Sequence, residues 1–364
     1  MKCLHVLPMN KLSGAEKLVL ILCKSMKKYK PVVVCGGENL KSVFEKEGIK
    51  TYSIDFKNKI KSTQNIKNII KDENIDIIHA HDNNASVVSY LTKKLYNLDT
   101  KLISHIHSCY PWLKLKNKTK TIDTFLRKKY DHNIACGNLV YDYYKKHTDY
   151  ITNENMSIIS NAIDIENIKV NKSSEIYEEF NIPKDKKIIG YVGRLIKLKG
   201  IDLFIEELKD NKDKFEDCII LIVGSGLLED EIKEKIKKYN IEDLVILTGQ
   251  TTDVYKFYQV IDILFLSSIY EGLPMVILEA MSVKKPVVSM DVGSINEVVI
   301  HNENGFLVEP KNYQEFIDYL YKLKSDETMI RKFGENAFNK INENYNIKNY
   351  EKEVSKLYDS LLNK

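Results

Sequence analysis

Residues 263–286 read "ILFLSSIYEGLPMVILEAMSVKKP" and carry the signals of a strand, a loop and a helix in direct succession. The apolar run 263–266 is typical of a buried strand, and Gly272 and Pro274 indicate a turn into a helix, because proline is favoured in a first helical turn. Glu271 then falls in the loop, and Glu279 falls inside an apolar helix. An unpaired buried charge is costly, so this stretch predicts either internal partners for the two acids or a ligand that they bind.

The same strand–loop–helix pattern recurs along the whole chain. Short apolar, β-branched segments alternate with helix-like stretches, which is typical of parallel sheets covered on both faces. The predicted strands are 3–7, 31–35, 51–54, 75–79, 101–105 and 132–136 in the first half, and 187–192, 218–223, 244–247, 263–266, 286–290 and 305–308 in the second. Two such series in 364 residues predict an α/β chain with two doubly wound domains.

A polar stretch separates the two series. Residues 162–185 are rich in Asn, Lys and Ser and lack a long apolar strand, so the linker is expected there. We therefore expect an N-terminal domain over residues 1–165 and a C-terminal domain over residues 166–346. A last helix, about 347–364, is expected to pack back onto the first domain through one apolar face: Tyr350, Val354, Leu357, Tyr358 and Leu361.

Composition restricts the class of protein. Hydrophobic residues make up 43% and charged residues 29% of the chain, as in ordinary soluble globular proteins. No segment approaches the roughly 18 apolar residues that span a bilayer, and the N-terminus reads as a strand and loop rather than a signal peptide. The six cysteines are scattered without a C-x-x-C pair, which argues against a disulfide framework and favours a reducing cytoplasm.

The charge is distributed unevenly. Residues 1–165 contain 27 Lys and Arg against 16 Asp and Glu, and the remainder contains 28 against 35. A basic first half is expected to face an anionic partner, such as a membrane surface, a nucleic acid or a phosphorylated substrate. A Lys-rich composition that only solvates the surface is the alternative.

The first half carries two candidate ligand-binding features. Gly14 opens a helix after the first strand, where a backbone amide can approach a ligand closely, although a tight turn explains it equally well. His79, His81, His105 and His107 fall at the carboxyl ends of two strands, where ligands of open α/β sheets bind. We expect at most one histidine per strand to be well placed, because the next one enters the loop. We therefore favour hydrogen-bond donors or packing residues over a metal site.

The second half places cations and glycines at strand ends. Arg194 and Lys199 follow the strand that ends near Gly193, and both suit phosphate oxygens. Gly224 lies at the next strand–helix turn. Solvated lysines and ordinary turns are the alternatives.

The two acids of the opening stretch complete a candidate site. Amides around Gly272 and Leu273 form an anion site where the helix begins. Glu271 and Glu279 would repel an anion, but they can accept hydrogen bonds from hydroxyl groups on either side of it. This arrangement favours a ligand with central phosphates and hydroxylated rings at both ends, which describes a nucleotide sugar. An acid that caps the helix and a second that is paired internally remain the alternative.

These motifs together resemble a known family. "GRLIKLKG" (193–200), "VGSG" (223–226), "EGLPMVILEA" (271–280), "DVGSINEVV" (291–299) and "NGFLVEP" (304–310) are similar to those of the retaining glycosyltransferases of family 4, also called glycosyl transferases group 1. "SGAEK", "DIIHAHD", "SHIHS" and "ISNAIDI" match more weakly in the first half. The resemblance implies the GT-B fold, in which two Rossmann-like domains face each other across a cleft.

The resemblance also implies roles for single residues. Arg194 and Lys199 match the pair that grips the donor diphosphate. Glu271 matches the acid that contacts the transferred sugar. Glu279 matches the acid that binds the ribose, and His107 matches the histidine near the donor sugar. The other matches are to donor-binding positions: Gly14, Gly193, Gly224, Gly272, Leu273 and Glu297.

The implied activity is transfer of a hexosyl group from a UDP- or GDP-linked sugar, with retention of the anomeric configuration and without a metal. The implied acceptor is a glycan or a lipid-diphosphate-linked glycan in bacterial cell-surface polysaccharide assembly. The basic segment 112–130, "WLKLKNKTKTIDTFLRKKY", suits an anionic inner membrane leaflet, or is only a solvated helix. Nucleic acid is not expected as a partner, because no reader motif is present. A non-catalytic nucleotide-sugar-binding subunit and a GT-B epimerase are the competing functions.

Two positions depart from the family pattern. Ser13 and Ala15 flank Gly14 where two adjacent glycines are common, and Ala162 follows Asn161 where glycine is usual. Alanine does not adopt a positive φ cheaply, so we expect a different turn before the linker.

Overall fold

The computed structural model describes residues 1–114, 118–152, 154–168, 174–251 and 253–363. The chain divides into two compact units, Met1–Ala162 with Asn346–Lys364 (unit 1) and Ile163–Tyr345 (unit 2). This division lies close to the boundary expected after residue 165.

Unit 1 is built on a parallel sheet of seven strands in the order β3-β2-β1-β4-β5-β6-β7. The strands are β1 (Lys2–Leu7), β2 (Lys30–Cys35), β3 (Thr51–Ser53), β4 (Ile77–His81), β5 (Lys101–Ile106), β6 (His132–Ala135) and β7 (Met156–Ile158). The helices are α1 (Gly14–Ser25), α2 (Glu38–Lys46), α3 (Lys59–Glu73), α4 (Asp82–Leu95), α5 (Lys118–Arg127), α6 (Asn138–His147) and α14 (Ile347–Leu362), and a 3₁₀ turn lies at Pro111–Lys114. The next 3₁₀ turn along the chain, Ile165–Asn167, already belongs to unit 2.

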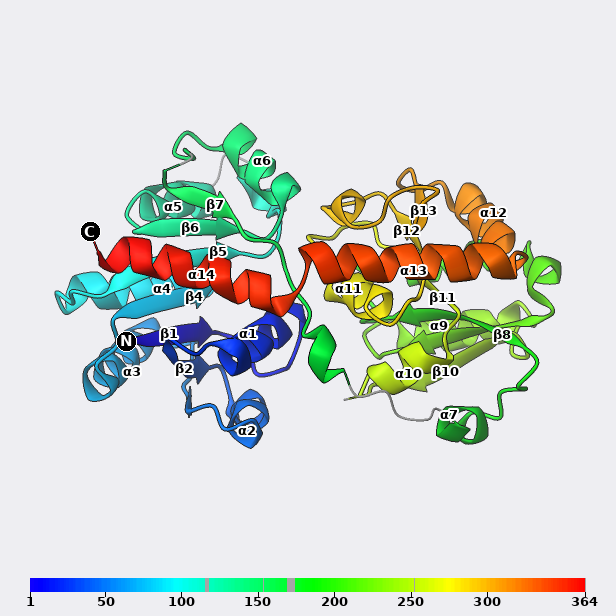
Figure 1. Cartoon of the computed structure of the whole chain (residues 1–364), viewed down its shortest axis with the longest axis horizontal. Coiled ribbons are helices and arrows are strands. Elements are labelled where there is room, and N and C mark those ends of the chain that lie inside the picture. Colours follow the sequence, from blue (N-terminus) through cyan, green and yellow to red (C-terminus); the bar gives the residue numbers. More distant parts are fainter. Residues whose placement is uncertain (115–117, 153, 169–173, 252, 364) are drawn as a thin grey trace. The chain divides into compact units, whose positions relative to one another are not determined.

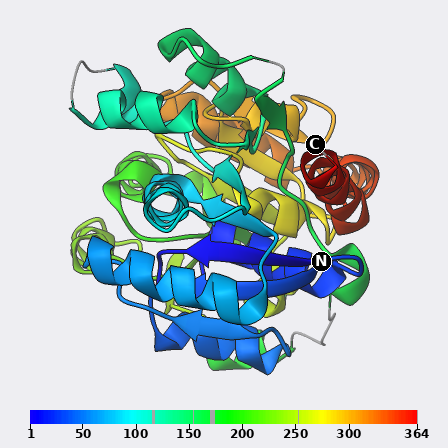
Figure 2. The same ribbon diagram turned by 90° about the vertical axis from the view of Figure 1, so that its left-hand side faces the viewer.

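Alternate side chains of these strands enter different cores. Leu4 and Val6 pack with α3 and α4, whereas Cys3 packs with α1 and α14 on the other face. Helix α14 buries one face against this second core and lies beside α1, as can be followed from the red and dark blue helices (Figure 1). Figure 2 shows the same strands of unit 1 with α3 in front of them. The C-terminal helix therefore belongs to the N-terminal unit.

Unit 2 is built on a parallel sheet of six strands in the order β10-β9-β8-β11-β12-β13. The strands are β8 (Lys187–Val192), β9 (Cys218–Val223), β10 (Val245–Gly249), β11 (Ile263–Leu266), β12 (Val287–Met290) and β13 (Gly305–Val308). The helices are α7 (Ser174–Glu179), α8 (Ile201–Leu208), α9 (Glu229–Lys238), α10 (Tyr255–Val260), α11 (Met275–Met281), α12 (Tyr313–Lys324) and α13 (Glu327–Asn344), with 3₁₀ turns at Lys197–Lys199, Lys212–Phe215 and Ile295–Glu297.

The two parallel α/β sheets confirm the predicted fold class of two Rossmann-like domains. Besides shifts of one or two residues at other strand ends, the following details differ from the sequence prediction. Strand β4 ends at His81 rather than His79, and the short strand β7 was not predicted. The segment 162–185 is not a plain linker, because it contains α7 and buries Ile176 and Ile182 in the core of unit 2.

Candidate functional site: strand ends of unit 2

The candidate site of unit 2 lies at the carboxyl ends of β8 and β11, which are neighbours in the sheet. From β8 the chain proceeds to β9 and β10 on one side, and then returns to β11, β12 and β13 on the other. Ligands of open α/β sheets bind at such a reversal of strand order. Residues 193–200 follow β8, and residues 267–274 follow β11, so the two strongest motifs meet at this point.

Glycines allow the loops at these strand ends to approach one another. Gly200 has φ +63° and would bring a Cβ within 2.2 Å of the Ser267 carbonyl oxygen. Gly224 has φ +140° and would bring a Cβ within 1.9 Å of the Gly193 carbonyl oxygen. A side chain at either position would force the loops apart.

Lys199 and Glu271 form the central contact of the site. The Lys199 Nζ atom lies 2.5 Å from Glu271 Oε1, and the Ser268 hydroxyl donates to the same oxygen at 2.6 Å. The two charged side chains are 18% and 9% exposed, respectively. The Ser267 hydroxyl also donates to the Lys199 carbonyl at 3.1 Å. The predicted phosphate-binding cation and sugar-binding acid therefore lie side by side, and the loops that carry them are bonded together.

Arg194 lies on the exposed side of the same loop. Its carbonyl accepts a hydrogen bond from the buried Tyr191 hydroxyl at 3.0 Å, and the amide of Leu195 donates to Ser225 at 3.0 Å. The backbone is thus held, whereas no carboxylate in the described part of the chain pairs with the guanidinium group. Arg194 is available for an anionic ligand.

The loop before α11 is joined to the loop after β12. The Ser294 amide donates to the Gly272 carbonyl at 2.8 Å, and Gly293 (φ +68°) would bring a Cβ within 2.4 Å of that carbonyl oxygen. Leu273 is buried, and Pro274 precedes the seven-residue helix α11. Glu297 is half-buried in the 3₁₀ turn of the same loop, and its carbonyl accepts from the Tyr345 hydroxyl at 3.0 Å.

Glu279 is more enclosed than Glu271. Its side chain projects from α11 into the core, where the residue is 3% exposed and Oε2 accepts from the Tyr258 hydroxyl at 2.9 Å. Burial, together with the charge of Glu279, raises the pKa of Tyr258, so this phenol remains a donor. One oxygen of the acid therefore has an internal partner, which the alternative interpretation of the sequence anticipated.

Candidate functional site: the histidine cluster of unit 1

In unit 1, Gly14 is the first residue of α1 and is exposed. Ser13 precedes it as the N-cap, with Glu16 closing a capping box in which the Ser13 amide donates to the Glu16 carboxylate at 3.2 Å. A serine in place of a second glycine thus anchors the start of the helix.

Five histidines of unit 1 stack on one face of the sheet, across its central strands. His5, His79, His81 and His105 are buried in strands β1, β4 and β5, and His107 is half-buried just after β5. Register explains the cluster, because His5 lies opposite His79 and His81 lies opposite His105. Burial lowers the pKa of each of these histidines, that of His5 to about 3, so the rings are neutral.

For β4, but not for β5, the structure corrects the prediction that the second histidine enters the loop. Because β4 extends to His81, neither His79 nor His81 enters a loop, and their rings stack with centroids 4.4 Å apart. His5 was missed altogether. The strand pattern of the sequence could have indicated it, because the side chain of His5 points to the opposite face from Leu4 and Val6. In the structure this is the face that also carries His79.

Other contributors were also missed. Ser268 binds Glu271, and Tyr258 binds Glu279, but neither belongs to a motif, and Tyr258 lies 21 residues from its partner. Hydroxyl partners of this kind are fixed by packing between elements and are not encoded in local spacing.

Comparison with known proteins identifies the class and then the family. The whole fold matches crystal structures of the GT-B type: that of Anabaena HepE in complex with UDP-glucose has a TM-score of 0.88 at 20% identity, over 99% of this chain and 100% of that one. The model of the glycosyl transferases group 1 matches residues 172–340, and that of glycosyltransferase family 4 matches residues 12–167. The chain belongs to the GT-B glycosyltransferases of group 1/family 4.

Relatives with named activities include the following two. A poly(ribitol-phosphate) alpha-N-acetylglucosaminyltransferase of Staphylococcus aureus (strain COL) is 33% identical over 56% of this chain, and the match spans only 41% of that protein. A UDP-Gal:alpha-D-GlcNAc-diphosphoundecaprenol alpha-1,3-galactosyltransferase of Escherichia coli is 24% identical over 84% of this chain and 81% of that protein.

Proposed function

We propose that this chain transfers a hexosyl group, with retention, from a nucleotide sugar to a glycan or lipid-diphosphate-linked acceptor in cell-surface polysaccharide biosynthesis. The observation that carries the proposal is the Lys199–Glu271–Ser268 contact at the reversal of strand order. A cation for phosphate and an acceptor for sugar hydroxyls are adjacent there, as a nucleotide sugar requires. UDP-linked donors are favoured over GDP-linked ones, because the E. coli relative is named for UDP-Gal and the HepE structure contains UDP-glucose.

In the proposed reaction the anomeric C–O bond to the β-phosphate breaks while the acceptor hydroxyl oxygen bonds to the same carbon on the same face. The leaving phosphate receives the hydroxyl proton. Arg194 and Lys199 stabilise the negative charge that grows on this phosphate. The two cations thereby fill the role that a metal ion has in other phosphate-leaving reactions. Glu271 and Glu279 bind hydroxyl groups of the sugar and the ribose, with Gly193, Gly224 and Glu297 shaping the loops. From unit 1, Gly14 and His107 are proposed to contribute to the donor site.

A nucleotide-sugar screen tests this proposal. We expect one UDP or GDP sugar to raise the unfolding midpoint and to yield a glycosylated product whose anomeric configuration, measured by NMR, equals that of the donor. Lys199→Ala should lower kcat at least ~100-fold, as loss of one oxyanion-stabilising group does. The matched control is Lys197→Ala, because Lys197 lies in the same 3₁₀ turn but pairs with Asp202 and Glu231 instead. Equal losses in the two variants, or no stabilising donor, would contradict the proposal.

We further propose that α5 places unit 1 on the inner face of the membrane. Ile122 and Phe125 are 53% and 57% exposed on this helix, and Lys118, Lys128 and Lys129 are exposed around them. Arg127 points the opposite way and is buried, bonded to Asp123 at 2.8 Å. In the basic segment Trp112 is half-buried and Leu113 is buried, and Leu115 lies outside the described residues. No helix in the described ranges has the length and apolarity to cross a bilayer.

Flotation with vesicles that contain anionic lipid tests this surface. The double variant Ile122→Ser/Phe125→Ser should lose most of its binding, because it removes the two apolar side chains but no charge. Leu95→Ser is the control, since Leu95 is 66% exposed beside Lys93 and Lys94 on another helix. If wild-type protein stays with the unbound fraction at physiological salt, the membrane proposal fails.

A further inference from the structure

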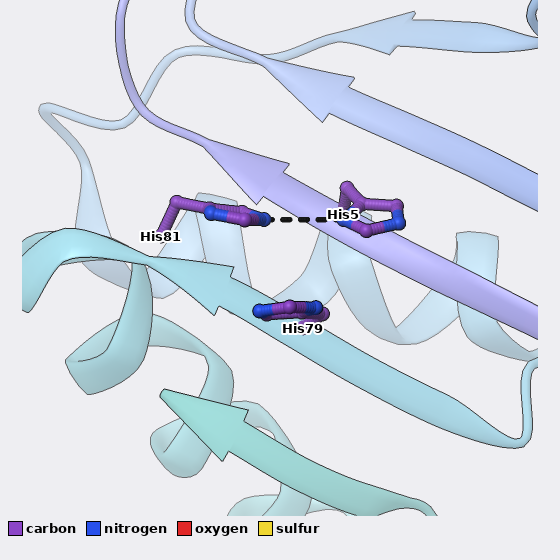
Figure 3. A group of neighbouring side chains, drawn as sticks. All are labelled: His5, His79 and His81. Carbon is purple, nitrogen blue, oxygen red and sulfur yellow. Dashed lines mark hydrogen bonds between the residues drawn. The ribbon is translucent and has the colours of Figure 1, made fainter. Parts of the chain in front are cut away.

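The buried histidines of unit 1 have the composition of a metal site. His5, His79 and His81 each offer one ring nitrogen, and these three atoms lie within 4.8 Å of one another (Figure 3). His5 Nδ1 and His81 Nε2 are 3.1 Å apart, close to the roughly 3.4 Å that separates two nitrogens on a tetrahedral zinc ion. Burial keeps the rings neutral, and neutral imidazole is the form that binds metals.

His79 provides an independent observation. Its Nδ1 atom lies 2.7 Å from the Tyr358 hydroxyl, whereas its Nε2 atom is buried with no hydrogen-bond partner among the described residues. A buried nitrogen without a partner costs roughly 1–3 kcal/mol, so such an atom calls for an explanation. A bound cation supplies one.

The outer partners of the three rings also fit. A histidine that binds a metal through one nitrogen usually donates its other N–H to a neighbouring acceptor, which fixes the ring. Tyr358 lies at the second nitrogen of His79, and His107 Nε2 lies 3.1 Å from His81 Nδ1. The Cys3 sulfur lies 3.6 Å from His5 Nε2. His5 and His81 therefore each direct one nitrogen at the other's ring and one at an outer partner, whereas His79 has one nitrogen at Tyr358 and one without a hydrogen-bond partner among the described residues.

A second trio, His81, His105 and His107, is arranged less favourably. These residues also bring three nitrogens within 4.8 Å of one another. However, neither nitrogen of His105 has a hydrogen-bond partner among the described residues, so no hydrogen bond orients this ring or selects its tautomer. His81 is common to both trios.

We propose that His5, His79 and His81 bind one divalent cation of the zinc type, with water as the fourth ligand. The site lies within unit 1 and is separate from the diphosphate-binding cations of unit 2, for which no metal is expected. Because Tyr358 belongs to α14 and His79 to β4, the bound metal would tie the C-terminal helix to the sheet through this hydrogen bond.

Equilibrium dialysis of the full-length chain against ZnCl₂ tests the proposal, with bound zinc measured by mass spectrometry. We expect one zinc per chain, a higher unfolding midpoint of unit 1, and loss of both with EDTA. Co²⁺ in place of zinc should show the visible bands of a tetrahedral site. Tyr358→Phe should weaken zinc binding 10- to 100-fold through loss of the outer partner.

Four variants decide which residues are involved. His5→Asn and His79→Asn should each weaken zinc binding more than ~100-fold, beyond the range for an outer partner. His105→Asn should leave it unchanged, and so should His132→Gln, in which the altered residue is buried in β6 but outside the cluster. Far-UV circular dichroism in EDTA checks that each variant folds.

Two results would overturn the site: wild-type protein that takes up no zinc, or zinc binding that survives in both His5→Asn and His79→Asn. Loss in His105→Asn with retention in His5→Asn would overturn the assignment of this trio in favour of the second one.

Discussion

At the scale of single residues, the contact between Lys199 and Glu271 is useful because both charged side chains are largely buried and the loops that carry them are joined by serine hydroxyls. Ser268 fixes the acid, and Ser267 bonds to the Lys199 carbonyl. When a nucleotide sugar binds and separates Lys199 from Glu271, both side chains are already close to their binding positions. Little side-chain entropy is therefore lost on binding.

Gly200 is predicted to be essential for this arrangement. Gly200→Ala should lower the free energy of unfolding of unit 2 by more than ~2 kcal/mol, because the left-handed conformation costs alanine ~1–2 kcal/mol and its Cβ would also strike the Ser267 carbonyl. Gly249→Ala is the matched control, since φ is +75° there and no atom lies within 4 Å of an added Cβ. Denaturant titration measures both, and equal losses would show that the close approach is unimportant.

Glu279 distinguishes a ligand-binding acid from an internally paired one. If it binds the ribose, Glu279→Gln should raise the KM for the donor roughly 10- to 100-fold, since a hydrogen bond to a charged group contributes ~1.5–3 kcal/mol. Tyr258→Phe removes the internal partner and should change stability more than KM. Initial-rate kinetics and thermal unfolding of both variants measure this. A purely structural Glu279 would lower the unfolding midpoint and leave KM unchanged.

At the scale of elements, strands bounded by glycines or charged residues could be predicted well. Lys187–Val192, Cys218–Val223 and Ile263–Leu266 have the predicted bounds, because each is a continuous apolar run that both sheet faces bury. Strand β7 was missed because it has only three residues, one of them serine. Helix α7 was missed because its surroundings are polar, although Ile176 anchors it in the core.

The candidate site was predictable to the extent that motifs encode it. Lys199 and Glu271 are 72 residues apart in sequence, yet they meet because the strands before them are neighbours. The histidine cluster was not predictable as a whole, since it depends on the register between β1, β4 and β5. Local patterns give the direction of a side chain, but register decides which side chains share a neighbourhood.

Glu73 joins three elements of unit 1 and should make its stability depend on acid pH. The Glu73 carboxylate at the end of α3 accepts from Lys2 of β1 at 3.0 Å and from Tyr52 of β3 at 2.6 Å, and Lys50 lies 2.5 Å away. Hydrogen bonds from Lys50 and Tyr52, together with Lys2, lower the pKa of Glu73 to about 2.

Since the folded pKa of Glu73 lies below the unfolded value of 4.5, the stabilisation is complete above pH 4.5 and is lost as pH falls toward 2. Glu73→Gln should lower the free energy of unfolding by about 1–2 kcal/mol at pH 7, a figure reduced to allow for solvent screening of the exposed lysines. At pH 2.5 the same substitution should lower it much less. Asp72→Asn, at the exposed neighbouring position, is the control. Urea titrations across this pH range measure it, and parallel curves for wild type and Glu73→Gln would exclude the assigned role.

At the scale of the whole molecule, the two units have separate hydrophobic cores. The core of unit 2 contains residues 163–345 only, whereas α14 completes a core of unit 1. The basic balance of the first half and the acidic balance of the second follow the same division. A ligand is therefore expected to stabilise most strongly the unit that makes most of its contacts.

The single tryptophan, Trp112, belongs to unit 1, so its fluorescence reports the unfolding of that unit alone, whereas far-UV circular dichroism reports both. UDP at 100 times its Kd should stabilise unit 2 by ~2.7 kcal/mol, a rise of roughly 5 to 10 °C in its Tm. The dichroism transition should shift, while the tryptophan transition shifts less. Lys199→Ala should abolish most of the effect. A UDP-induced shift confined to tryptophan fluorescence would instead assign nucleotide binding to unit 1, because only contacts made in the folded state of a unit can raise its Tm.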